Sequence, residues 1–152
     1  MSSQFKPSTA DYKEKIIKSF NRQRVMETLN ASILSIHPGE IELEFPYQSN
    51  LTQQHGFIHA GIVSTLLDSA CGYAAFSLMP ENAAVLTIEF KINLLSPAKE
   101  ERFRAVGKVK KPGKNITVTQ GELFSHTNEG EKLVATMVAT IMSVYERKDI
   151  QY

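Results

Sequence analysis

A single carboxylate lies in the middle of a long apolar stretch of this chain. Residues 59–79, HAGIVSTLLDSACGYAAFSLM, are predicted to form a buried helix, and Asp68 is their only carboxylate. Moving an unpaired carboxylate out of water costs several kcal/mol, so such a group usually has a partner, a shifted pKa or a chemical task. We therefore interpret Asp68 as a candidate catalytic group.

Polar and flexible residues gather just before this stretch, at Gln53, Gln54, His55, Gly56 and His59. A helix that only fills the core would not need so many polar and flexible residues before it. The start of a helix also presents free backbone N–H groups that favour negative charge. The sequence therefore predicts an active site at the beginning of the helix. The alternative is a structural carboxylate, with Asp68 hydrogen-bonded to Ser64 or Thr65 one turn earlier.

The composition limits the classes of partner. The 152 residues, 42% of them hydrophobic, are enough for a single domain, 1–152, with a real core. A net charge of +1 gives no strong field, so we expect no nucleic-acid or membrane partner. Cys71 is the one cysteine and the four histidines are far apart, so we expect no disulfide and no metal. Residues 1–9 show no secretory signal, which favours a cytoplasmic location.

The elements around the apolar stretch read as a helix followed by strands. Apolar residues recur at helical spacing over 8–23, with Ser8 as the expected N-cap, and the helix can continue through 24–29. Alternating patterns predict strands at 31–37, 40–47, 84–95, 103–110, 115–124 and 132–145. In the strand 84–95, we expect Thr87 on the face opposite Phe90. The Pro112-Gly113 pair marks a hairpin turn.

This order favours an α+β fold. Strands joined by short turns make an antiparallel sheet, so we expect about five to six strands wrapped around one long central helix. A helical segment, 1–30, precedes the sheet and a short tail, 148–152, follows it. We do not interpret 59–79 as a membrane span, because it carries Asp68 and several other polar residues. Pairing with an identical copy would cover the exposed helix and sheet edge.

Two segments carry a resemblance to a known family. QQHGFIHAG at 53–61, with Asp68 nine positions after His59, resembles the signature of the PaaI-like acyl-CoA thioesterases, which have the hotdog fold. TIEFKINLLSPA at 87–98 resembles the family's strand after the helix, and the similarity covers roughly 48–145. The family pattern is an Asn, a Gly three further on, then His-Gly-Gly and an Asp in the helix. Gly56, His59, Gly61 and Asp68 match this pattern.

Two positions depart from that pattern. Gln53 replaces the Asn, which keeps the amide but moves it by about one methylene. Ala60 replaces the first Gly of the pair and keeps the backbone N–H. We expect both departures to tune rate or substrate choice more than to abolish activity.

The resemblance implies hydrolysis of an acyl-CoA to a carboxylic acid and CoA, with no cofactor besides the CoA of the substrate. Asp68 would act as general base or as nucleophile, assisted by Thr87. The Ala60 N–H, next to Gly61, would stabilise the oxyanion. Gln53 would position the water or the carbonyl, and His59 would orient the loop or the substrate.

The expected substrate contacts lie in two places. His55 and Gly56 precede the helix and belong to the predicted site. Lysines around the Pro112-Gly113 turn, chiefly Lys108, Lys111 and Lys114, could contact the CoA phosphates. The alternative for these lysines is a solvated hairpin tip.

The spacing of Ala60 and Asp68 predicts a site shared between subunits. Eight residues at ~1.5 Å each separate their backbones by ~12 Å along one helix, so one carbonyl cannot easily meet both. We expect a homodimer or homotetramer in which Gln53, His59 and Ala60 of one subunit meet the Asp68 and Thr87 of another. Two alternatives stay open: a non-catalytic acyl-CoA or lipid-binding protein, and a hotdog hydratase or dehydratase that pairs a histidine with the carboxylate.

Overall fold

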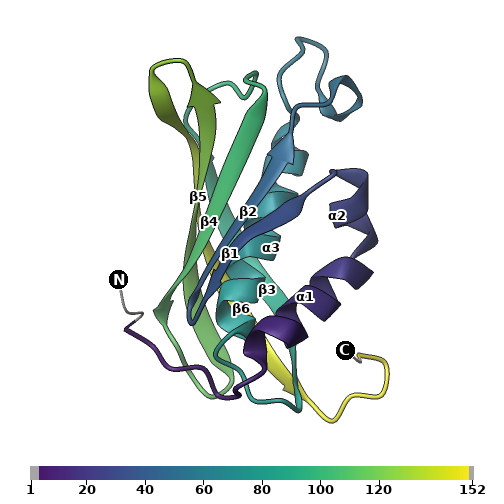
Figure 1. The fold of residues 1–152 in the computed structure, drawn as a ribbon, viewed down its shortest axis with the longest axis vertical. Helices are drawn as coiled ribbons and strands as arrows, with labels where there is room; N and C mark the ends of the chain where they lie inside the picture. The colour runs from purple at the N-terminus through teal and green to yellow at the C-terminus, as the bar shows by residue number, and fades with distance from the viewer. Residues whose placement is uncertain (1–3, 151–152) are drawn as a thin grey trace.

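The computed structural model describes residues 4–150 (Figure 1). Residues 1–3 of the expected helical segment and 151–152 of the expected tail lie outside this range. The helices are α1 (Tyr12–Arg22), α2 (Arg24–Thr28), the short 3-10 turn η1 (Ser49–Leu51) and α3 (Ala60–Phe76). The strands are β1 (Ser32–His37), β2 (Glu40–Pro46), β3 (Ala83–Leu94), β4 (Arg102–Lys111), β5 (Ile116–Thr127) and β6 (Gly130–Tyr145).

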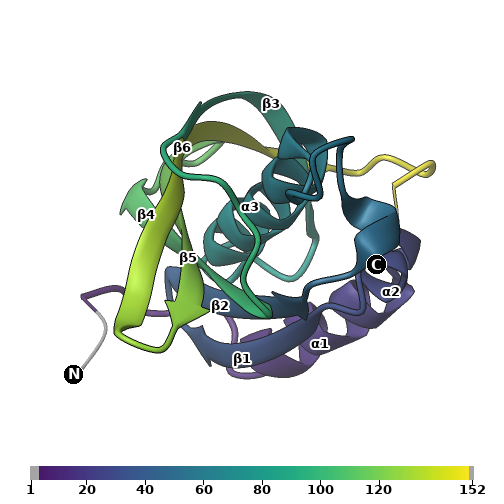
Figure 2. The same ribbon diagram turned by 90° about the horizontal axis from the view of Figure 1, so that it is seen from above.

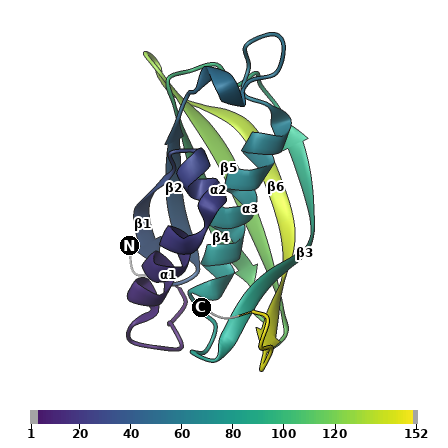
Figure 3. The same ribbon diagram turned by 90° about the vertical axis from the view of Figure 1, so that its right-hand side faces the viewer.

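The six strands form one antiparallel sheet in the order β1-β2-β4-β5-β6-β3. The sheet curls around α3, which is enclosed when the molecule is viewed from above (Figure 2). The helices α1 and α2 lie beside α3 on the side away from β3 (Figure 3). This is the hotdog fold, and the prediction of an α+β protein with one central helix is confirmed.

The central helix is buried because the sheet approaches it closely. Its buried residues include Leu66, Leu67 and Ala70, none of which is exposed to solvent. Gly107 of β4 allows this approach, since a Cβ there would lie 2.2 Å from the carbonyl oxygen of Ala70. Every helix within residues 4–150 falls short of the length and apolar character that a membrane span requires.

The first helix begins later than the sequence predicts. It starts at Tyr12, and its N-cap position, Asp11, makes no side-chain capping bond. The expected cap, Ser8, instead donates its hydroxyl to the carbonyl of Leu78, beyond the end of α3. The capping prediction is therefore wrong, because Ser8 ties the N-terminal segment to the central helix.

A β-bulge in β3 changes which side chains face the helix. Thr87 pairs with Ile141 and Glu89 pairs with Thr140, so the register shifts between Thr87 and Glu89. Phe90 pairs with Ala139, and both Ala139 and Ile141 belong to the buried core. Thr87 and Phe90 therefore share the inner face. The expectation of strict alternation is wrong here, and the bulge turns Thr87 towards α3.

Candidate active site

A tight turn precedes the central helix. The Gly56 N–H donates to the carbonyl of Gln53 at 3.0 Å, and Gly56 has a φ of +80°, a conformation that favours glycine. The hydroxyl of Tyr47 donates to the Gly56 carbonyl at 2.9 Å and fixes the turn to the end of β2. The glycine of the sequence motif is thus explained by backbone geometry.

The turn orients the Gln53 amide. Its Oε1 accepts the His55 backbone N–H in a short hydrogen bond, which leaves the Nε2 group as a donor without a partner among residues 4–150. Gln53 and Ala60 line the same recess of about 330 Å³ beside the helix start. His55 itself is exposed, and its ring lies 3.4 Å from the Gln54 side chain. Gln53 can therefore donate a hydrogen bond to an oxygen bound beside Ala60.

The first turn of α3 keeps one backbone N–H available. His59 is the N-cap, and its Nδ1 accepts the N–H of Gly61 at 2.9 Å. The N–H groups of Ile62 and Val63 both donate to the His59 carbonyl. The Ala60 N–H has no partner among the described residues. Ala60 is thus the donor that an oxyanion can reach, whereas the Gly61 N–H is already occupied.

Asp68 lies two turns further along α3 and faces β3. Thr87 donates its hydroxyl to Oδ1 of Asp68 at 2.7 Å. Burial raises the pKa of Asp68, and the Thr87 hydrogen bond partly opposes that rise. Ser64 and Thr65 do not satisfy Asp68, because their hydroxyls donate to the carbonyls of Ala60 and Gly61 one turn earlier. The structural alternative in its predicted form is therefore wrong.

The two halves of the predicted site are separate within one chain. Asp68 and Thr87 line a recess of about 260 Å³ that shares no lining residue with the recess at Gln53 and Ala60. The helix rise of ~1.5 Å per residue sets Ala60 and Asp68 ~12 Å apart along the axis. One chain therefore presents the carboxylate and the N–H donor to two different places.

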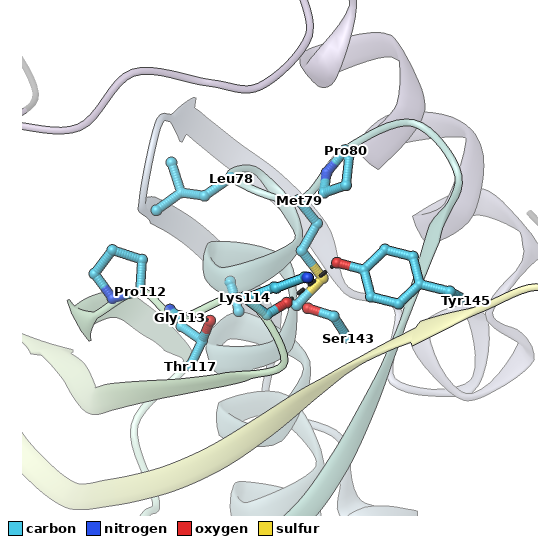
Figure 4. Close-up of a pocket in the computed structure, with 10 residues that line it drawn as sticks. Leu78, Met79, Pro80, Pro112, Gly113, Lys114, Thr117, Ser143 and Tyr145 are labelled. Carbon is cyan, nitrogen blue, oxygen red and sulfur yellow. Dashed lines mark hydrogen bonds between the residues drawn. The ribbon is translucent and has the colours of Figure 1, made fainter.

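The predicted lysine contacts do not border either recess. Lys108 points to the sheet face away from α3 and pairs with Glu40 at 3.4 Å. Lys111 is exposed at the end of β4. Lys114 borders a mainly apolar cavity of about 500 Å³ at the C-terminal end of α3, where its carbonyl accepts the Tyr145 hydroxyl (Figure 4). These lysines lie at the end of the molecule opposite the helix start.

Other candidate groups are not suited to chemistry. Cys71 is fully buried in α3, and burial raises the pKa of its thiol to about 12, so it is not available as a thiolate nucleophile. Within residues 4–150 no three histidine, cysteine, aspartate or glutamate side chains gather in a way that could hold a metal ion. Asp68 remains the carboxylate that the fold holds in a recess at the central helix.

The family comparison agrees with this geometry. A family model described as "Thioesterase superfamily" matches residues 55–132, which include the helix start, Asp68 and Thr87. The chain belongs to the thioesterase superfamily. The resemblance seen in the sequence is thereby confirmed, and membership supports thioester hydrolysis as the class of reaction.

Similar proteins support the same assignment. A crystal structure of a thioesterase family protein from Silicibacter pomeroyi is 55% identical, covers 89% of this chain and 99% of its own, and has a TM-score of 0.87. A provisionally named esterase of Saccharolobus solfataricus is 30% identical over 77% of this chain and 78% of its own length. The E. coli PaaI protein of the phenylacetic acid degradation operon shares the fold, at 19% identity, with coverage of 90% of this chain and 96% of that chain and a TM-score of 0.80.

Two residues at the site were not singled out in the sequence. Tyr47 anchors the Gly56 turn, and Gln23, at the break between α1 and α2, lines the Asp68 recess. Gln23 contacts α3 through Ser69, 46 positions away, so no local pattern could reveal it. An aromatic residue at the end of a strand is so common that Tyr47 carried no signal either.

Proposed function

We propose that the protein hydrolyses the thioester of an acyl-CoA to a carboxylic acid and CoA. The observation that carries this proposal is Asp68, the one carboxylate among the described residues that line its recess in a thioesterase-superfamily fold, which accepts a hydrogen bond from Thr87. Asp68 is partly buried, and a carboxylate with a raised pKa is a stronger base than one at its usual pKa. Asp68 is therefore suited to take a proton from water at neutral pH.

In the proposed reaction, Asp68 accepts a proton from a water molecule while the water oxygen attacks the thioester carbon. The carbonyl oxygen becomes an oxyanion and accepts hydrogen bonds from the Ala60 N–H and the Gln53 amide. Collapse of the tetrahedral intermediate breaks the carbon–sulfur bond, and the proton on Asp68 passes to the departing thiolate. Direct attack by Asp68, through a mixed anhydride, uses the same residues.

The proposed site requires two copies of the chain. The edge strand β3 leaves the large apolar side chains of Ile88, Phe90 and Leu94 exposed, and Leu95, which follows the strand, is exposed too. A second copy that covers this edge, with its α3 antiparallel to the first, would bring its Asp68 and Thr87 beside Ala60, Gln53 and His59. The separation of the two recesses supports this arrangement. Whether two such dimers assemble further does not affect the chemistry.

The CoA nucleotide would extend away from the thioester towards the protein surface. Lys111 and Lys114 are exposed, and we propose that they meet its phosphates from the second copy. Lys108 is a weaker candidate, because its ammonium already pairs with Glu40. No bound cofactor is needed for this reaction.

The test is thiol release from a panel of short, medium, long and aromatic acyl-CoAs, measured for the parent and for Asp68→Asn. We expect turnover of at least one substrate and a loss of about 10²–10⁴-fold in kcat for the variant, which still binds substrate. Ser64→Ala, one helical turn away, is the matched control and keeps most of the activity. Undiminished turnover by Asp68→Asn would place the catalysis elsewhere.

A further inference from the structure

One wall of the recess that holds Asp68 is polar. One side is formed by β3, with Val85, Leu86 and Thr87. The opposite side, formed by α1, the α1–α2 junction and the next turn of α3, is lined by Ser19, Gln23, Ser69, Gly72 and Tyr73. A recess meant for a plain alkyl chain would not need hydroxyl and amide groups in this wall.

Gln23 is the residue in this wall whose side chain has a hydrogen-bond donor left unused within residues 4–150. Its Oε1 accepts the hydroxyl of Ser69 at 2.8 Å, and Ser69 directly follows Asp68 in α3. Its Nε2 group has no partner among residues 4–150. The Gln23 backbone N–H donates to the Phe20 carbonyl at 3.0 Å, which fixes the residue at the break between the two helices. The amide is therefore oriented, with its N–H donors unused.

The wall that carries Gln23 is rigidly attached to α3. The Ser19 hydroxyl lies 3.2 Å from the Tyr73 hydroxyl in a buried hydrogen bond. The rings of Phe20 and Tyr73 are 6.0 Å apart, and Ile16 is fully buried in the same core. These contacts already join α1 to α3. The Gln23 side chain is consequently not needed to hold the helices together.

We propose that Gln23 determines substrate specificity by donating a hydrogen bond to an oxygen on the acyl group. This inference rests on the proposed thioesterase function, in which the thioester carbonyl lies beside Asp68. The substrate class is then a short acyl group with a hydroxyl or keto oxygen near the thioester. A saturated acyl group would remove water from the Gln23 amide without replacing the lost hydrogen bond.

The size of the recess limits the acyl group. Its volume of about 260 Å³ lies below the range of about 300–1,000 Å³ that is typical of pockets for drug-sized ligands. Tyr73 and Val85 line the recess together with Gln23. A short oxygenated group fits this space, whereas a long chain would have to leave it.

The test compares kcat/KM for butanoyl-CoA, for both enantiomers of 3-hydroxybutanoyl-CoA and for 3-oxobutanoyl-CoA. We expect the parent to prefer at least one oxygenated substrate over butanoyl-CoA by about fivefold, the effect of one neutral hydrogen bond. In Gln23→Leu this ratio falls to about one, because leucine has a similar size and no donor. Ser69→Ala, which removes the bond that orients the amide, lowers the ratio in part. Gln120→Leu, the same change on the far face of the sheet, leaves the ratio unchanged.

Three results would overturn the inference, and they are distinguishable. Equal kcat/KM for all four substrates in the parent would refute it and leave the thioesterase proposal intact. A Gln23→Leu variant that loses the same factor on every substrate would show that Gln23 only supports the fold. If the parent cleaves no acyl-CoA at all, the proposed function fails and this inference fails with it. If Gln23→Leu does not fold, Ser69→Ala still tests the inference, because it removes the hydrogen bond that orients the Gln23 amide; an unchanged ratio in that variant would overturn the inference.

Discussion

A site shared between two copies predicts that two inactive variants restore activity when they are mixed. Gln53→Ala removes a donor from one half of the site, with an expected loss of about 10²–10³-fold, and Asp68→Asn removes the base from the other half. After denaturation, mixing in equal amounts and refolding, about half of the dimers carry one chain of each kind. Each mixed dimer has one site with both residues intact and one with neither. Total activity should therefore return to about one quarter of the parent value.

The same assay supplies a control mixture and a result that would refute the shared site. Gln53→Ala mixed with His59→Ala should recover nothing, because both residues belong to the same half and every mixed site keeps one defect. If each site instead lay within a single chain, the Gln53→Ala and Asp68→Asn mixture would stay at the level of the separate variants. That result would refute the argument from the two recesses. Thiol release and the fraction of mixed dimers, counted by mass spectrometry, are the two measurements.

Three further predictions follow from single contacts. Thr87→Val removes the hydroxyl that stabilises ionised Asp68, so the pKa of Asp68 should rise further. We expect the acid limb of the pH profile of kcat/KM to move up by about one to two pH units. Burial raises the pKa of Asp68 in the folded chain above the unfolded value of about 3.9, so the folded chain loses stability as the pH rises from about 3.9 through the pKa of folded Asp68. Asp68→Asn removes this loss and should raise Tm at pH 7 but not at pH 3. Gly107→Ala forces a Cβ against the backbone carbonyl of Ala70 and should lower the free energy of unfolding by about 3 kcal/mol in urea titrations. Gly121→Ala meets side chains instead, the nearest being those of Cys71 and Leu67 at 3.0 and 3.1 Å, and should cost about 1 kcal/mol.

The elements of the fold were predictable because their signals are local. An apolar run of helical length gave α3, alternation gave the strands, and the Pro112-Gly113 turn between β4 and β5 was evident from two residues. The observed helix is shorter than 59–79: it ends at Phe76, and the N–H groups of Leu78 and Met79 donate to carbonyls three residues earlier, as in a tighter turn. The edge position of β3 could not be read from the order of the elements, because β3 pairs with β6 rather than with β4, the strand that follows it in the sequence.

The errors arose where distant contacts decide the structure. The bulge in β3 cannot be read from an alternating sequence, yet it decides whether Thr87 meets Asp68. Ser8 resembles a helix cap in the sequence and instead bonds to Leu78, 70 positions away. In each case a three-dimensional neighbour overrides a valid local preference.

The distance between Ala60 and Asp68 has a chemical reason. A carboxylate in the first turn of α3 would accept the free N–H groups itself, which would lower its pKa and occupy the donors that an oxyanion needs. Two turns further on, partial burial raises the pKa of Asp68, and the Ala60 N–H stays available. One helix can therefore carry both a basic carboxylate and a free N–H donor only when the two groups are separated along it. A second copy of the helix is then the simplest means to bring the two groups to the same carbonyl. Dissociation of the proposed dimer should therefore abolish turnover without unfolding the chain.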